Sequence, residues 1–178
     1  MDPQQIAKTV LAAMTALLLT ACAAGHPFQK EVLSGDKEAL LYVYRPARFL
    51  SSGETPDIYI NGTKALALVN GGYSFFRIAP GRYRVEIKKP SGPFAFMVSD
   101  FSSMVEFSAE YNNSYFVRWS PELLDSSFMY VPVGSGAVLG SFKRSGNMIL
   151  LNEQAAVSEI SKCNYLEPGA SQVPPIGE

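Results

Sequence analysis

The chain has 178 residues and a formal net charge of −1 at pH 7; 47% of its residues are hydrophobic and 17% are charged. This length is enough for one domain with a hydrophobic core. The near-neutral charge excludes the basic surface that nucleic-acid-binding domains need, so we expect no nucleic-acid partner. The charged fraction lies below the roughly 25% of typical globular chains, which indicates a well-filled core or a surface that a partner covers.

Residues 1–21 have the order of a secretory signal peptide. Lys8 is followed by an uncharged apolar run and by small residues that lead to Cys22. The run is shorter than the roughly 20 residues that a membrane-spanning helix needs. The sequence Leu19-Thr20-Ala21-Cys22 resembles the lipobox of bacterial lipoprotein precursors. It predicts cleavage between Ala21 and Cys22 and a lipid, including palmitate, on Cys22; the alternative is an ordinary secretory signal with a chance cysteine.

The two cysteines of the chain limit its covalent chemistry. If Cys22 carries a lipid, Cys163 is the one cysteine left, and a disulfide within the chain is impossible. We expect Cys163 to be buried, because a free cysteine behaves as a small hydrophobic residue. The expected domain organisation is a lipidated cysteine and tether over residues 22–36, a folded domain over 37–166 and a disordered tail over 167–178.

Short apolar segments alternate with turn signals through most of the expected domain, which is typical of an all-β sandwich or barrel. The Asn61-Gly62 pair predicts a type I′ hairpin turn, because both residues tolerate a positive φ. The strands that we expect are Ala39–Arg45, Ile58–Ile60, Thr63–Val69, Tyr73–Ile78, Arg82–Lys89, Phe94–Val98, Met104–Phe107, Tyr115–Trp119 and Phe128–Val133, with Pro46 ending the first and Pro121 the eighth.

Two segments carry a clear periodicity. Arg82–Lys89 alternates polar and apolar residues, which predicts an antiparallel strand with one solvated face. Asn152–Asn164 has the composition of a helix with Asn152 as the N-cap, and Ala156, Val157, Ile160 and Cys163 fall on one face at helical spacing. The sequence therefore predicts a mainly β, antiparallel sandwich with one C-terminal helix.

Four turn and strand-end motifs follow one another in the first half of the domain: Tyr42-Val43-Tyr44-Arg45-Pro46, Ile58-Tyr59-Ile60-Asn61-Gly62, Gly72-Tyr73 and Ala79-Pro80-Gly81-Arg82-Tyr83. Their order behind a lipobox resembles a family of small bacterial envelope lipoproteins of unknown function. The resemblance covers about Ala39 to Val133. It implies a prealbumin-like or related β-sandwich on a lipid tether, and it implies no reaction and no catalytic residues.

The residues needed for common catalytic centres are scarce. The single histidine, His26, lies in the expected tether. The chain therefore lacks the histidine that a catalytic triad needs within the domain, and the several His or Cys ligands that a typical zinc site needs. Glu106, Glu110, Glu122 and Asp125 are candidate acids for a carboxylate-dependent hydrolase, although solvated surface acids are the simpler interpretation. The Gly134–Gly140 stretch departs from a dinucleotide-binding loop in its spacing, and we expect a flexible loop or a bulge there. We therefore expect no catalytic residues, no metal site and no cofactor.

Aromatic residues offer a different kind of site. Tyr42 and Tyr44 share one face of the first strand, and together with Trp119 they are candidates for binding a glycan or a partner strand. The competing interpretation is that these rings fill the core, because apolar strand residues usually pack inward.

We expect a non-catalytic, lipid-anchored module that binds an envelope protein, through a strand edge or a loop cluster. The alternatives are a glycan- or peptidoglycan-binding module and a carboxylate-dependent hydrolase. Ala23 and Ala24 follow the lipidated residue, and neither is the acidic residue of an inner-membrane retention signal. The expected location is therefore the outer membrane, facing the periplasm, with the inner membrane as the alternative.

Overall fold

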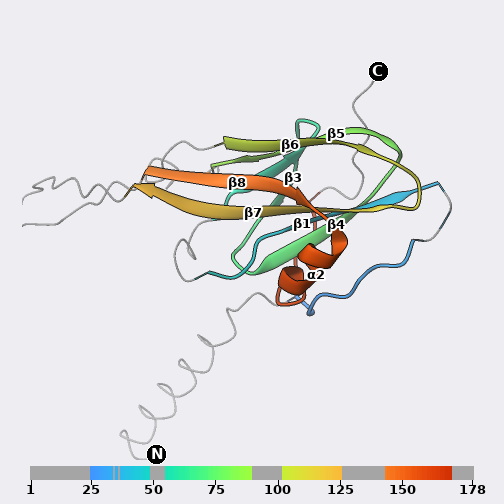
Figure 1. Ribbon diagram of the computed structural model, residues 1–178, viewed down its shortest axis with the longest axis horizontal. Helices are drawn as coiled ribbons and strands as arrows, with labels where there is room; N and C mark the ends of the chain where they lie inside the picture. The colour runs from blue at the N-terminus through green and yellow to red at the C-terminus, as the bar shows by residue number, and fades with distance from the viewer. Residues whose placement is uncertain are drawn as a thin grey trace, which may run out of the picture.

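In the computed structural model, two β-sheets face each other and one helix lies outside them (Figure 1). The structure describes residues 25–33, 35, 37–48, 55–89, 102–125 and 143–169, without the side chains of 122–125 and 143–145. The elements are β1 (Ala39–Tyr44), β2 (Asp57–Ile60), β3 (Thr63–Ala67), β4 (Gly72–Ile78), β5 (Gly81–Lys88), β6 (Ser102–Ala109), β7 (Ser114–Asp125), β8 (Lys143–Leu151), α2 (Glu153–Ile160) and β9 (Asn164–Tyr165).

The first sheet has the order β8-β7-β1-β4-β9. β1 pairs with β4 in antiparallel register, from Ala39 opposite Ile78 to Tyr44 opposite Tyr73. β1 runs parallel to β7, and β4 runs parallel to β9, so this sheet is mixed rather than purely antiparallel. Parallel neighbouring strands need a long connection between them. Here the connection from β1 to β7 contains β4 and all the strands of the second sheet.

The second sheet has the order β3-β2-β5-β6 and is antiparallel throughout. Its β2–β3 hairpin contains the expected type I′ turn, since φ is 51° at Asn61 and 80° at Gly62. β5 alternates as predicted, with Tyr83, Val85 and Ile87 buried while the charged residues between them are more exposed. The sequence prediction of a mainly β sandwich with a C-terminal helix is confirmed.

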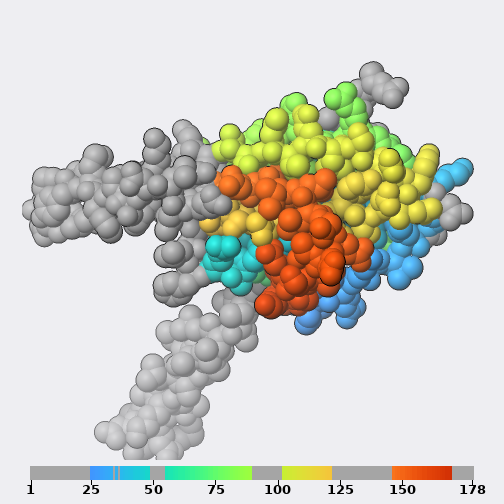
Figure 2. All heavy atoms as spheres, viewed as in Figure 1, coloured from blue at the N-terminus to red at the C-terminus, as the bar shows by residue number. Residues whose placement is uncertain are grey.

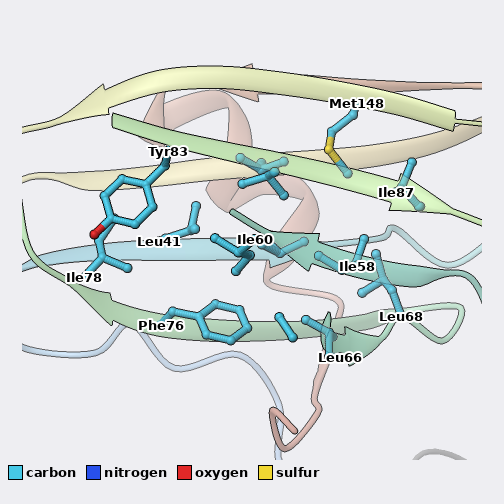
Figure 3. Packing of buried hydrophobic residues seen from close by; sticks show 14 of the residues in the cluster. Leu41, Ile58, Ile60, Leu66, Leu68, Phe76, Ile78, Tyr83, Ile87 and Met148 are labelled. Atoms are coloured by element: carbon cyan, nitrogen blue, oxygen red, sulfur yellow. The ribbon is translucent and has the colours of Figure 1, made fainter. Parts of the chain in front are cut away.

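Side chains from the facing sides of the two sheets interdigitate to form the main core (Figure 3). Leu41 and Phe76 come from the first sheet, and Ile58, Ile60 and Ile87 come from the second. Burying an aliphatic or aromatic side chain of this size contributes about 1.5–3 kcal/mol relative to leaving it exposed. This burial drives the two sheets together.

A third layer covers the outer face of the first sheet. The helix α2 begins after Asn152, whose side chain accepts a hydrogen bond from the Ala155 N–H at 2.9 Å, as an N-cap does. Ala156 and Ile160 of this helix pack in a second cluster with Tyr42 and other residues of the sheet. Residues 25–33, here called the strap, also lie on this face, although the sequence suggested a tether there (Figure 1).

Two strand predictions differ from the structure. Pro121 does not end its strand, because β7 continues to Asp125. β1 stops at Tyr44, opposite Arg118, and Pro121 lies beyond that point and opposite Gly146 of β8. At Pro121, β7 pairs with β8 on one side and with no strand on the side where β1 has ended. A proline has no N–H to donate, and on this one-sided stretch no hydrogen bond to β1 is lost, so the proline is tolerated. β8 was not predicted as a strand, because its Lys143–Gly146 start is polar and contains glycine.

Two of the predicted strands, Phe94–Val98 and Phe128–Val133, lie outside the described residues.

Candidate functional site

The longest open strand edges belong to β6 and β8. Among the described residues, β6 pairs only with β5 and β8 pairs only with β7. The two strands are in contact with each other at the side of the sandwich, and Figure 2 shows the atoms of β8 beside those of β6. We call these two strands the edge surface. Open edges present unpaired backbone groups, which makes them natural sites for an added strand.

Two apolar side chains are exposed on the edge surface. Met104 of β6 is 54% exposed and Leu150 of β8 is 40% exposed, and both are among the large exposed hydrophobic residues of the described chain. Isolated exposed apolar residues are common on protein surfaces. Here they lie on two strands that already offer backbone hydrogen bonds, which is the combination that strand addition uses.

One hydrogen bond shows which way the β8 backbone faces. The Met148 N–H donates to Ser103 Oγ of β6 at 3.0 Å, so it points away from β7. N–H groups alternate in direction along a strand, and the Leu150 N–H therefore also points toward the open edge. An incoming strand on this side of β8 would keep the hydrogen bonds between β7 and β8, but it would have to displace the Met148–Ser103 hydrogen bond that joins β8 to β6.

The three aromatic residues predicted to bind a glycan are buried, which corrects that assignment. The relative exposure is 0% for Tyr42, 0% for Tyr44 and 1% for Trp119. Tyr42 and Tyr44 lie beneath α2 and the strap, whereas Trp119 points between the two sheets. Burial of large rings is strongly favourable, and the third layer covers the only sheet face on which the two tyrosines could have been exposed.

Arg45 is buried beside Trp119. Its relative exposure is 0%, and its guanidinium carbon lies 4.7 Å from the centre of the indole ring. Such a cation–π contact contributes up to about 2 kcal/mol when it is desolvated. The Tyr-Arg-Pro motif therefore places a structural arginine at the end of β1, a role that the sequence analysis did not identify.

Glu159 links α2 to the sheet beneath it. Tyr44 donates its hydroxyl to Glu159 Oε2 at 3.0 Å, and Arg118 Nη1 donates to Glu159 Oε1 at 2.8 Å. Burial, followed by the charge of Glu159, raises the pKa of Tyr44 above its ordinary value. Tyr44 therefore stays protonated at neutral pH and acts as a hydrogen-bond donor that positions the helix.

Cys163 lies under the end of α2 with 1% exposure, which confirms that it is buried. Its thiol contacts the Arg45 carbonyl oxygen at 3.6 Å. Burial, followed by the charge of Glu159, raises the pKa of the Cys163 thiol to about 12. A thiol in this state is a poor nucleophile, so we assign Cys163 a packing role.

The candidate acids do not form a catalytic pair in the described structure. Glu106 accepts a hydrogen bond from Arg84 Nε at 2.6 Å on the outer face of the second sheet. Glu110 is exposed beside Asn113, at the turn before β7. The side chains of Glu122 and Asp125 lie outside the described residues. In the described part of the chain, no group of three or more His, Cys, Asp or Glu side chains is placed to hold a metal ion.

Several predicted features lie outside the described residues. They are the signal segment 1–21 with Ala21, the lipidation residue Cys22, and the Gly134–Gly140 stretch. Within the described residues, no helix is long and apolar enough to cross a membrane. The sequence analysis missed the edge surface, because β8 has no apolar alternation that would identify it from sequence alone.

Comparison with known proteins identifies a family but no function. No curated protein and no solved structure is significantly similar to this chain. The model of a family described as a protein of unknown function (DUF2846) matches residues 35–131, a range that contains β1 to β7 and the turns between them. Because this match covers more than half of the 178 residues, the chain belongs to the uncharacterised DUF2846 family.

Proposed function

We propose that this protein is a lipid-anchored, non-catalytic module that binds an envelope protein by strand addition at the edge surface. The observation that carries the binding role is the pair of open edges of β6 and β8, which lie side by side and carry the exposed Met104 and Leu150. A partner strand would gain backbone hydrogen bonds from the edge and apolar contacts from these two side chains.

The anchor part of the proposal rests on the lipobox before Cys22. Acylation at Cys22 would hold the module at one membrane, which we propose is the outer membrane because Ala23 and Ala24 follow the modified residue. One acyl chain binds a bilayer only marginally, so stable anchoring needs the several chains of a mature lipoprotein. The partner search then takes place in two dimensions, which raises the effective concentration of a second envelope protein.

Site-specific photo-crosslinking in cells tests the binding role. A photo-reactive residue at position 104 or at position 150 should capture the same envelope protein. The same residue at position 67 is the control, because Ala67 is exposed on β3, which forms the opposite edge of the second sheet from β6. Leu150→Pro removes the outward N–H and should abolish capture from position 104. Equal capture from position 67, or capture that survives Leu150→Pro, would contradict the proposal.

Palmitate labelling tests the anchor. Cys22→Ser should abolish the label and leave an unprocessed precursor or a soluble product. Unchanged labelling would refute the lipoprotein assignment. Separation of the two membranes on a sucrose gradient tests the location, and recovery with inner-membrane markers would overturn the proposed sorting.

A further inference from the structure

The strap is held on the first sheet by residues that are distant from it in the chain. Phe28 donates its N–H to the Cys163 carbonyl oxygen at 3.1 Å, and the His26 carbonyl oxygen accepts the Tyr165 N–H at 2.8 Å. These bonds join the beginning of the described chain to the segment that follows α2. Because the two segments are distant in sequence, the same bonds can form whether the strap belongs to this molecule or to a second copy.

The strap covers an aromatic floor. The Phe28 ring lies 5.2 Å from the Tyr73 ring and 5.8 Å from the Tyr42 ring, and the Tyr42 hydroxyl accepts the Glu31 N–H at 2.9 Å. Both tyrosines are 0% exposed, whereas every strap residue is half-buried or exposed. The strap is therefore a surface layer, and the buried rings beneath it need a strap from one copy or another.

A short connection joins the strap to β1. Five residue steps separate Leu33, the last strap residue, from Glu38, and they span at most about 18 Å. Gly35 in this connection is exposed, and a Cβ atom there would meet no atom within 4 Å, so no packing at Gly35 holds the chain in its turned-back path. A terminal segment on such a hinge can be exchanged between identical chains at low cost, because the same contacts form again.

The connection lies at the same end of the sandwich as the turn that joins β6 to β7, where Asn112 donates its N–H to the Glu38 carbonyl oxygen (Figure 1). Val32 is 80% exposed and Tyr111 is 57% exposed. A cavity of about 550 Å³ opens between the strap and this turn, and its lining includes Val32, Leu33 and Asn112. We call Val32, Leu33, Tyr111 and Asn112 the hinge end. Its two exposed apolar side chains gain when a second molecule covers them.

We propose that two copies of this chain form a dimer by exchanging their straps, with the hinge ends of the two domains facing each other. In the dimer, Phe28 of each copy lies between Tyr42 and Tyr73 of the other. The short connection keeps the two domains close together at this end, so Val32 and Tyr111 of both copies are covered. Exchange preserves the strap contacts, and the covered apolar surface favours the dimer. This assembly requires neither acylation of Cys22 nor the edge surface.

A disulfide between two copies tests the exchange. Pro27 lies opposite Asn164 in an antiparallel bridge, so cysteines at these two positions are within disulfide range. One full chain carries Pro27→Cys, another carries Asn164→Cys, and the two have different epitope tags and are produced in the same cell. Mild oxidation should join the two tags, because the strap of one copy lies on the other. Cys163 is buried and stays out of reach.

Pro27→Cys paired with Ser108→Cys is the matched control. Ser108 is exposed on β6 next to Phe107, which packs against the main core, so position 108 faces solvent on the far side of the sandwich from the strap. We expect several-fold more disulfide with Asn164→Cys than with this control. Equal yields would overturn the exchange. Light scattering of the purified full chain in detergent should show a dimer, and a monomer would overturn the assembly.

Two further variants test the hinge and the hinge end. An insert of about six Gly and Ser residues after Gly35 should favour the turned-back strap and lower the disulfide between copies several-fold, since longer hinges disfavour exchange. Val32→Ser combined with Tyr111→Ser should lower the dimer fraction several-fold by removing the apolar side chains that the dimer covers. Dimer fractions unchanged in both variants would contradict the strap-exchanged dimer.

Discussion

Gly146 of β8 lies directly against the indole ring of Trp119. A Cβ atom at position 146 would come within 2.4 Å of Trp119 Nε1 and 3.0 Å of Cε2. The ring fills the space that a side chain would occupy, so this glycine is required by packing and not by its backbone conformation. The contact joins β8 to the interior of the sandwich at the point where Trp119 also meets Arg45.

Gly146→Ala should therefore displace the indole. Overpacking of this kind costs about 1–3 kcal/mol, and we expect the melting temperature to fall by several degrees. Trp119 is the only tryptophan of the chain, so intrinsic fluorescence reports on its surroundings directly. The emission should shift to longer wavelength in the folded variant. An unchanged spectrum and an unchanged melting temperature would show that β8 does not pack against Trp119.

Gly62→Val should destabilise the domain through the backbone alone. Gly62 has a φ of 80°, and a Cβ there meets no atom within 4 Å, so steric contact plays no part. A side chain at positive φ costs of order 1 kcal/mol, and a β-branched one costs more. Gly35→Val is a matched control, because position 35 is also open space but has no positive φ. Thermal unfolding should separate the two variants, and equal melting temperatures would contradict the type I′ hairpin.

The Cys163 thiol should resist alkylation in the folded protein. It is 1% exposed, and its pKa is raised to about 12, so it is both inaccessible and protonated at pH 8. Iodoacetamide should label it only after denaturation, as mass spectrometry would show. Rapid labelling under native conditions would mean that α2 opens away from the sheet.

Stability should fall at alkaline pH because several buried groups, Tyr42 and Cys163 among them, stay protonated in the folded state. Burial raises the pKa of Tyr42 from 10.0 to about 12, and burial with Glu159 raises that of Cys163 from 9.0 to about 12. The unfolded chain releases these protons first, so the stabilisation is complete below about pH 9 and is lost as the pH rises toward 12.

Urea unfolding at pH 8 and at pH 11 measures this loss. Tyr42→Phe should reduce the difference between the two pH values, because phenylalanine has no proton to release. It should also lower stability at pH 8 by about 1 kcal/mol, since the Glu31 N–H loses its acceptor. Tyr111→Phe is the control, as Tyr111 is 57% exposed at the turn after β6. An equal pH effect in both variants would contradict the role of burial at Tyr42.

The sequence by itself determined the features that depend on local chemistry. The Asn61-Gly62 turn, the alternation of β5 and the Asn152 cap each follow from the conformational or hydrogen-bonding preferences of neighbouring residues, and the structure contains all three. The burial of Cys163 could also be predicted from its helical spacing to Ile160, although α2 ends at Ile160, short of the predicted Asn164, and Cys163 lies just beyond it.

Tertiary structure alone decided where the remaining surfaces lie. Tyr42 and Tyr44 alternate with Leu41 and Val43, but all four are buried, because a helix more than 100 residues later covers the second face of the strand. The edge surface exists because β6 and β8, from different sheets, end up side by side. Such pairings depend on contacts between residues distant in the chain, and local sequence patterns carry no information about which distant partner a strand or a strap will meet.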